Sequence, residues 1–443
     1  MKSTLNLIAL ASVMSLSGAV LAQPAPAPAA KPAPAAKAPA AKPAPAPVAS
    51  APAETKGQTV KVAMIEGLSG PFGSIGQNAL KSFQFVAERM NGANNPAGVN
   101  FEYVPFDSKG SPQEALNALK AATDQGFRYV TQGNSSAVAG ALSDAVQKFN
   151  DRNPGKEVVY LNYAAVDPAL TNERCSYWHF RIDADTSMKM EALTTFMKDD
   201  TKVKKVYLLN QNYAHGQQVA KYFKEGIEHK RKDVTIAGED LHPIGQVKDF
   251  APYVAKIKAT GADTIVTGNW GQDMTLLVKA INDSGYKVKI YAYYGGVSGT
   301  PTALAAGKDL DVSQVAISHD GFTGASGKLR DDFKAKFNDY YYTYQTYTEV
   351  AMFAAAMAKA KSTDAVKVAA AMEGLTFQAA SGEATMRKTD HQLQQYVFIS
   401  KWTKADKKNP YSTEDTGYNF ALVKTLEPYI ASTPTSCQMK RPG

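Results

Sequence analysis

From Val60 onward the chain alternates short runs rich in β-branched and aromatic residues with longer stretches whose apolar residues recur at helical spacing. The short runs predict nine strands, at Val60–Ile65, Asn100–Phe106, Tyr129–Thr131, Val158–Tyr163, Lys205–Asn210, Val234–Leu241, Thr264–Thr267, Lys289–Tyr294 and Gln314–Ser318. The longer stretches predict helices at Gln77–Asn91, Pro112–Gln125, Ala137–Phe149, Ser187–Met197, Gln217–His229, Phe250–Thr260 and Met274–Ser284. This alternation is typical of parallel sheets covered by helices, and nine strands favour two α/β lobes over one.

The loops that follow the predicted strands are the candidate binding segments, because ligands of open α/β sheets bind beyond the carboxyl ends of the strands. These loops mix glycines, hydroxyl groups and aromatic rings, and they span residues 66–72, 132–136, 163–167, 211–215, 268–273 and 293–296. The second and the fifth precede predicted helices, whose first free N–H groups can receive a carboxylate.

The N-terminus has the pattern of a secretory signal peptide, with Lys2, an apolar stretch from Leu5 to Val20, and the small-residue cleavage pattern Val20-Leu21-Ala22. A transmembrane anchor is the alternative, but serines and a glycine interrupt the stretch, which is short for a bilayer span. We therefore predict a signal peptide over residues 1–22 and a mature protein outside the cytoplasm, which the resemblance described below places in the periplasm. No cysteine lies near the cleavage point, so the sequence gives no indication of a lipoprotein.

Residues 23–56 form an Ala/Pro/Lys-rich segment. Ten of the 23 prolines of the whole chain lie in it, all of them before residue 54. Such a composition cannot bury enough apolar surface to fold, so we predict a disordered linker. Recognition of this segment by an anionic cell-wall or membrane partner is the alternative.

The formal net charge of +8 is a weak signal for nucleic-acid binding once it is divided along the chain. Residues 57–443 carry 44 basic and 40 acidic side chains, and the basic runs 202–205 and 230–232 are short. We interpret them as solvated faces, and we expect no nucleic-acid partner.

Residue patterns for catalysis and cofactors are missing from the sequence. The six histidines are scattered singly, and no P-loop, dinucleotide fingerprint or nucleophile elbow is present. We therefore expect that the protein binds no metal and no cofactor and is not an enzyme. A secreted hydrolase, whose catalytic residues lie apart in the sequence and meet only in the folded protein, is the remote alternative. The two cysteines, Cys175 and Cys437, predict either one disulfide or two buried thiols.

A series of short motifs extends over residues 58–430, in the order Val60–Phe72 with Gly76, Phe106–Ala115, Tyr129–Ser136, Asp167–Thr171, Tyr213–Gly216, Lys248–Phe250, Gly261–Ile265, Thr348–Ala360, Glu373–Phe377 and His391–Gln392. Together they resemble the periplasmic branched-chain amino acid (Leu/Ile/Val) substrate-binding proteins of ABC transporters. The resemblance implies a type I periplasmic binding protein fold, in which two α/β lobes joined by three crossovers close on a ligand.

Placed on this sequence, the crossovers fall near Arg181-Ile182, Tyr291-Ala292 and Gln395-Tyr396. Lobe 1 then comprises residues 57–181 and 292–395, and lobe 2 comprises residues 182–291 and 396–443. A disulfide between Cys175 and Cys437 would brace the hinge.

The resemblance also implies a set of ligand-binding residues. Ser136, with Ser135 beside it, matches the serine that holds the ligand carboxylate. Ala164 and Val166 match positions whose backbone groups face the carboxylate and the ammonium. Asp273 matches the acid for the ammonium, and Tyr213 packs over the ligand.

Three positions depart from the family pattern. Val166 replaces a threonine, Ile75 replaces an aromatic residue, and Trp270 brings a large ring near Asp273. These departures leave room for an aromatic acid or an amide as ligand.

The sequence therefore predicts a monomeric solute-binding protein that passes an amino acid or related carboxylate to an ABC transporter permease. A ligand sensor with the same fold is the alternative.

Overall fold

The computed structural model describes residues 54–307 and 310–442. The predicted signal peptide and nearly all of the predicted linker lie outside the described residues. The folded part begins before the predicted boundary at residue 56, because Thr55 is buried and its hydroxyl donates to the carbonyl of Ala97 at 2.6 Å.

Two sheets organise the described chain. The strands are β1 (Thr59–Glu66), β2 (Asn100–Asp107), β3 (Tyr129–Gln132), β4 (Val159–Asn162), β5 (His179–Arg181), β6 (Lys205–Gln211), β7 (Thr235–His242), β8 (Thr264–Thr267), β9 (Lys289–Ala292), β10 (Asp311–Ala316), β11 (Thr376–Ala379), β12 (Gly382–Met386), β13 (Leu393–Gln394), β14 (Val397–Lys404) and β15 (Tyr418–Leu426). The first sheet is entirely parallel, in the order β2-β1-β3-β4-β5. The second has the order β15-β14-β10-β9-β8-β6-β7, and β11, β12 and β13 form a small third sheet.

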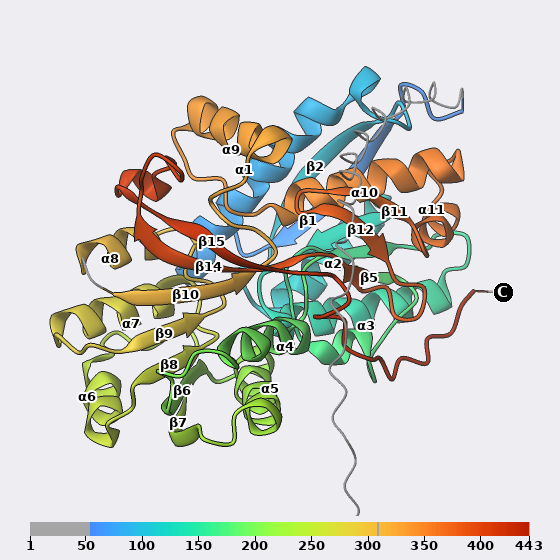
Figure 1. Ribbon diagram of the computed structural model, residues 1–443. Helices are drawn as coiled ribbons and strands as arrows, with labels where there is room; N and C mark the ends of the chain where they lie inside the picture. The colour runs from blue at the N-terminus through green and yellow to red at the C-terminus, as the bar shows by residue number, and fades with distance from the viewer. Residues whose placement is uncertain (1–53, 308–309, 443) are drawn as a thin grey trace, which may run out of the picture. The chain divides into compact units, whose positions relative to one another are not determined.

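Helices cover both large sheets (Figure 1). They are α1 (Gly73–Met90), α2 (Pro112–Asp124), α3 (Ser136–Arg152), α4 (Thr186–Met197), α5 (Ala214–Lys230), α6 (Ala251–Thr260), α7 (Gly271–Asp283), α8 (Thr300–Ala306), α9 (Gly324–Phe337), α10 (Gln345–Ala360) and α11 (Ala365–Met372). Short 3-10 helices, η1 to η4, lie at Gly70–Phe72, Gly92–Asn94, Pro168–Thr171 and Thr413–Asp415. Among the described residues, none of the helices combines the length and apolar character that a membrane span requires.

The buried apolar residues separate into two lobes. The core of the first lobe draws on residues 60–182 and 329–393, and the core of the second draws on residues 184–317 and 397–431. The second core is divided between the two faces of the seven-stranded sheet. The predicted two-lobed α/β fold is confirmed.

The predicted position of the second crossover, at Tyr291-Ala292, is wrong. After β9 the chain stays in the second lobe, because β10 pairs in parallel with β9 and antiparallel with β14. The chain changes lobe only beyond Ala316, between the buried Ile317 of the second core and α9 of the first. The predicted strand Gln314–Ser318 is this β10, which begins at Asp311.

The first and third crossovers lie side by side at the hinge, where Arg181 and Gln392 form an isolated parallel bridge. The fully buried Arg181 donates through Nε to Gln392 Oε1 at 2.5 Å and forms an ion pair with Asp185 at 2.9 Å. Gln395 donates to the carbonyl of Ile182 at 2.5 Å. Buried amide and guanidinium groups therefore join the two crossing strands.

The C-terminal segment, residues 432–442, returns to the first lobe. The predicted boundaries had assigned it to the second lobe. The predicted disulfide is present, with the Cα atoms of Cys175 and Cys437 5.7 Å apart. Thr435 donates to the carbonyl of Thr171 at 2.7 Å, and Arg441 pairs with Glu373 at 2.8 Å. The segment thus spans the hinge region and is covalently attached to the first lobe.

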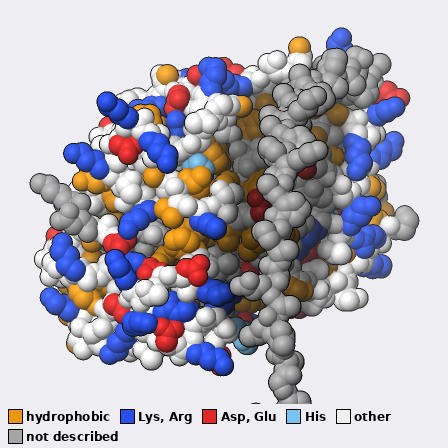
Figure 2. Space-filling view, in the orientation of Figure 1, with side chains coloured by type: hydrophobic (Ala, Val, Ile, Leu, Met, Phe, Trp, Pro, Cys, Tyr) orange, Lys and Arg blue, Asp and Glu red, His pale blue; other side chains and the backbone are white. Residues whose placement is uncertain are grey.

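The short basic runs lie on ion-paired surface. Lys204 pairs with Asp233 at 2.6 Å and Lys230 with Glu191 at 2.8 Å. Basic and acidic side chains are interspersed over the lower part of the face in Figure 2. This arrangement agrees with the interpretation of the runs as solvated faces.

Candidate ligand-binding site

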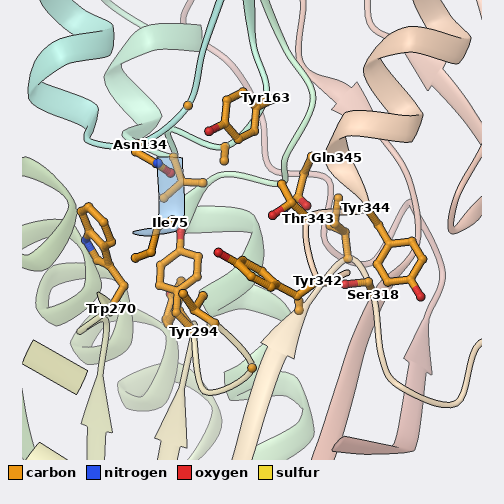
Figure 3. A pocket seen from close by; sticks show the side chains of 18 of the residues that line it. Ile75, Asn134, Tyr163, Trp270, Tyr294, Ser318, Tyr342, Thr343, Tyr344 and Gln345 are labelled. Carbon is orange, nitrogen blue, oxygen red and sulfur yellow. The ribbon is translucent and has the colours of Figure 1, made fainter. Parts of the chain in front are cut away.

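A cavity of about 110 Å³ lies between the two lobes. First-lobe residues that follow β3 and β4 form one wall, and second-lobe residues that follow β6, β8 and β9 form the other. Figure 3 shows Asn134 and Tyr163 on one side of it and Trp270 and Tyr294 on another. An apolar cavity of about 150 Å³ takes up benzene, so this cavity suits one small molecule.

The first-lobe wall contains the start of α3. After β3 the chain turns through Gly133 and Asn134, and Ser135 adopts a φ of +77°, which is strained for a residue with a side chain. Ser136 begins α3, and no side chain caps this end of the helix. Because the first N–H groups of a helix lack intrahelical partners, this turn can receive a carboxylate.

Gly133 makes the turn possible by its lack of a side chain. A Cβ atom at this position would lie 2.7 Å from the backbone nitrogen of Ala164 and 2.7 Å from the Tyr163 ring. The loops after β3 and β4 therefore pack backbone to backbone.

Glu66, the last residue of β1, joins three loops of the first lobe from behind this wall. Its Oε2 accepts hydrogen bonds from the N–H groups of Gly133 at 3.2 Å and Asn134 at 3.1 Å, and from the Tyr163 hydroxyl. Its Oε1 accepts from the N–H of Gly67 at 3.1 Å. Burial raises the pKa of Glu66 to about 7, although these four hydrogen bonds act in the opposite direction.

Ala164 and Val166, for which the resemblance implies contact with the ligand, line the cavity. The side chain of Asn162 holds their loop through two hydrogen bonds with the backbone of Ala165, at 2.7 and 2.9 Å. The carbonyl of Val166 accepts from both the N–H and the hydroxyl of Thr186, each at 2.9 Å. Both acceptor positions of that carbonyl are engaged, so the predicted backbone contact between Val166 and a ligand ammonium has no support here.

Aromatic side chains form the second-lobe wall. Trp270 and Tyr213 both line the cavity, and the Trp270 indole N–H donates to the Tyr213 hydroxyl at 2.8 Å. Tyr293 and Tyr294 complete this wall. It therefore offers rings where the first-lobe wall offers backbone amides.

Asp273 does not line the cavity, in contrast to its predicted role. Its side chain is fully buried, and its Oδ2 accepts from Gln211 Nε2 at 2.7 Å and from the N–H of Gly245 at 2.8 Å. Asp273 lies in the first turn of α7, where its position on the helix decides which way the side chain points. Here it supports the loops of the second lobe.

Two charged residues that sequence reasoning missed line the cavity, and both have partners. Lys189 pairs with Asp183 at 2.8 Å. Asp320 accepts from the Tyr340 hydroxyl at 2.5 Å and from Thr413 Oγ1 and the N–H of Phe420, both at 2.7 Å. The carboxylate that a ligand ammonium requires is therefore already hydrogen-bonded within the protein.

Residues of the segment before α10 also line the cavity, and the sequence signal for them was the tyrosine run that begins at Tyr340. The Tyr342 hydroxyl, Gln345 Oε1 and Asn134 Nδ2 are buried atoms without a hydrogen-bond partner among the described residues. Figure 3 shows the Tyr342 ring extending toward the centre of the group of side chains. These atoms are available to a polar ligand.

An aromatic contact joins the lobes at the edge of the cavity. Phe72 of the first lobe lies with its ring centroid 4.3 Å from that of Trp270. Gly245 and Gly271 leave space for this ring, since a Cβ atom on either would lie 3.2 Å from it. The lobes are thus closed on each other.

Comparisons with known proteins agree with this architecture. A family model described as periplasmic binding protein matches residues 59–408. The Leu/Ile/Val-binding protein homolog 4 of Brucella melitensis is 31% identical over 401 residues, which cover 87% of this chain and 94% of that protein. The leucine-, isoleucine-, valine-, threonine- and alanine-binding protein of Pseudomonas aeruginosa is 24% identical over 328 residues, or 73% of this chain and 84% of that protein.

Two solved structures have similar folds. The leucine-, isoleucine-, valine-, threonine- and alanine-binding protein from Brucella ovis, in a closed conformation, has a TM-score of 0.76 and 28% identity, over 87% of this chain and 100% of that one. A solute-binding protein of an ABC transporter from Rhodopseudomonas palustris, in complex with p-hydroxybenzoic acid, has a TM-score of 0.70 and 20% identity, over 84% of this chain and 98% of that one.

Proposed function

Because the chain belongs to the periplasmic binding protein family, we propose that it captures a small amino acid-like carboxylate between its lobes and delivers it to an ABC permease outside the cytoplasm. The family is one of binding proteins rather than enzymes. Ligand binding shifts an equilibrium between open and closed lobes, and the closed form is the one that docks on the permease.

The start of α3 on the cavity wall is the observation that carries this proposal. Ser135 and Ser136 provide hydroxyl groups next to unpaired helical N–H groups, and the whole turn is held by Glu66. Hydrogen bonds to a charged acceptor are about twice as strong as neutral ones. A carboxylate is therefore the group that this wall recognises best.

An aromatic carboxylic acid is the second candidate ligand. It is favoured by the rings of Trp270, Tyr213, Tyr293 and Tyr294, and by the position of Asp273 outside the cavity lining. An amino acid needs an acceptor for its ammonium, whereas an aromatic acid needs none.

Calorimetry on protein that has been unfolded, dialysed and refolded tests the proposal. L-leucine, 4-methylpentanoate, L-leucinamide and benzoate separate the contributions of the carboxylate, the ammonium and the ring. We expect leucine or benzoate to bind with a Kd of about 10 μM or lower, and leucinamide to bind at least tenfold more weakly than leucine. Failure of all three carboxylates, or equal binding of leucinamide and leucine, contradicts the proposal.

A further inference from the structure

Glu66 lies behind the first-lobe wall of the cavity rather than on it. We propose that Glu66 is the positioning residue of the carboxylate-binding turn, and that a carboxylate ligand binds together with a proton that Glu66 takes up from solvent. This inference rests on the proposed function, because it requires the ligand carboxylate to lie at the start of α3.

The hydrogen bonds of Glu66 give it the positioning role. Its donors belong to the loops after β1, β3 and β4, and the last two of these loops contain Ser135, Ser136 and Ala164. Asn134, whose N–H donates to Glu66, directly precedes the strained Ser135. A single carboxyl group thus fixes the loops that form the first-lobe wall.

The described groups that interact most strongly with Glu66 are backbone amides and a phenol, whereas Lys189 on the cavity wall is paired with Asp183 and Arg181, which interacts with Tyr160, is paired with Asp185. Three phenols interact with Glu66: Tyr160 on β4, Tyr163 in the loop after it, and Tyr342 in the segment before α10. Burial raises the pKa of each of these tyrosines. Burial also raises the pKa of Glu349, on α10, well above its usual value. Asp107, opposite Glu66 on β2, is exposed to solvent, and Gly76 of α1 lies against the Glu66 side chain.

A ligand carboxylate at Ser136 would bring a second negative charge into a buried site next to Glu66. Two carboxylates that share such a site cannot both stay ionised at low cost, so the pKa of one rises. The ligand carboxylate keeps its charge because the free N–H groups of α3 bind it. Glu66 therefore takes a proton from the solvent, and its neutral carboxyl group still accepts hydrogen bonds from the loop amides.

Calorimetry in two buffers of different ionisation enthalpy measures this proton directly. The probe is L-leucine or benzoate, whichever binds more tightly, and neither changes its protonation near pH 7. Since burial already raises the pKa of Glu66 to about 7, we expect uptake of about half a proton per ligand at pH 7. Uptake should fall toward zero at pH 5, where Glu66 is protonated before the ligand binds.

Glu66→Gln should abolish proton uptake and lower the affinity for the probe several-fold. Its matched control is Glu349→Gln, which also removes a buried acid of the first lobe but one that binds Thr131 instead of the cavity loops. This control should retain wild-type proton uptake. Uptake that persists in Glu66→Gln, or disappears in Glu349→Gln, overturns the inference.

A second measurement follows the Glu66 carboxyl group itself. In protein with ¹³C-labelled glutamate, the carboxyl resonance that is lost in Glu66→Gln should titrate near pH 7, and saturating probe should move its midpoint upward. A midpoint that the probe leaves unchanged overturns the inference. Binding of a probe without proton uptake contradicts this inference alone, whereas failure of leucine, 4-methylpentanoate and benzoate to bind contradicts the proposed function as well.

Discussion

The two walls of the cavity are built differently. The first-lobe wall consists of backbone from Gly133, Ala164 and their neighbours, packed so closely that no side chain fits between the two loops. The second-lobe wall consists of the rings of Trp270 and the tyrosines; the Trp270 indole donates to the Tyr213 hydroxyl, and the Tyr293 hydroxyl donates to the carbonyl of Thr186. The first wall is therefore fixed in shape and polar, whereas the second can adjust by side-chain movement.

This difference suggests a division of labour in recognition. A fixed array of N–H groups is suited to the group that every ligand of the site has in common, the carboxylate. Rings select ligands by shape, and they can be changed by substitution without disturbing the backbone. The following predictions test this division, from the largest expected effect to the smallest.

Gly133→Ala should have the largest effect. The added Cβ atom would lie 2.7 Å from the Ala164 nitrogen, so the two loops must separate. We expect the free energy of unfolding to fall by about 2 kcal/mol and the affinity for the carboxylate probe to fall about 100-fold, which is ~2.7 kcal/mol. Urea denaturation and calorimetry measure the two quantities.

The matched control is Gly296→Ala on the second-lobe wall. There the nearest atoms, 3.3 Å from the added Cβ, belong to the flexible side chain of Gln314. We expect less than a fivefold change in affinity, about 1 kcal/mol. Equal losses in the two variants would show that the walls do not differ in rigidity.

Phe72→Ala should weaken binding by an intermediate amount. It removes the tilted ring contact with Trp270 that joins the closed lobes, and aromatic pairs contribute about 0.5–1.5 kcal/mol beyond their buried area. We expect about tenfold faster dissociation of the probe, measured by stopped-flow tryptophan fluorescence. Phe72→Leu should restore part of the loss, whereas an unchanged dissociation rate for Phe72→Ala would mean that the ligand alone holds the lobes together.

Asp273→Asn should have the smallest effect on ligand choice. Its carboxylate accepts hydrogen bonds from Gln211 and Gly245 and does not line the cavity. The ratio of affinities for leucine and 4-methylpentanoate should therefore change less than twofold, about 0.4 kcal/mol. A tenfold loss of preference for leucine over 4-methylpentanoate would mean that Asp273 binds the ligand ammonium, and that the second-lobe wall carries a charge.

Much of the fold is predictable because its inner parallel strands, such as β3 and β8, are buried on both faces, and because strands and helices alternate along the chain. The predicted bounds of Asn100–Phe106 and Thr264–Thr267 differ from β2 and β8 by one residue at most. The three-residue β5 is too short to show a period, and β14 and β15 pair by antiparallel contacts that local sequence does not specify. The second crossover was placed too early because nothing in the local pattern distinguishes a strand that stays in its sheet from one that leaves it.

The candidate site was predictable where loops follow strands, and less so where a side-chain direction matters. Ser135, Ser136, Ala164, Val166, Tyr213 and Trp270 all line the cavity. Asp273 does not, because one turn of helix presents side chains in every direction. Glu66 belongs to one of the predicted loops, but its role depends on bonds to Gly133 and Tyr163, some 70 and 100 residues away in the chain.

The two core segments of each lobe also set the order in which the protein can be assembled. Synthesis runs from the N-terminus, but the first core needs residues up to Leu393 and the second needs residues up to Ala431. The first lobe therefore cannot be completed in a nascent chain before Leu393 has been made, nor the second before Ala431. Cys437 follows both of these residues, so the disulfide with Cys175 forms only in a chain that already contains every residue of both cores.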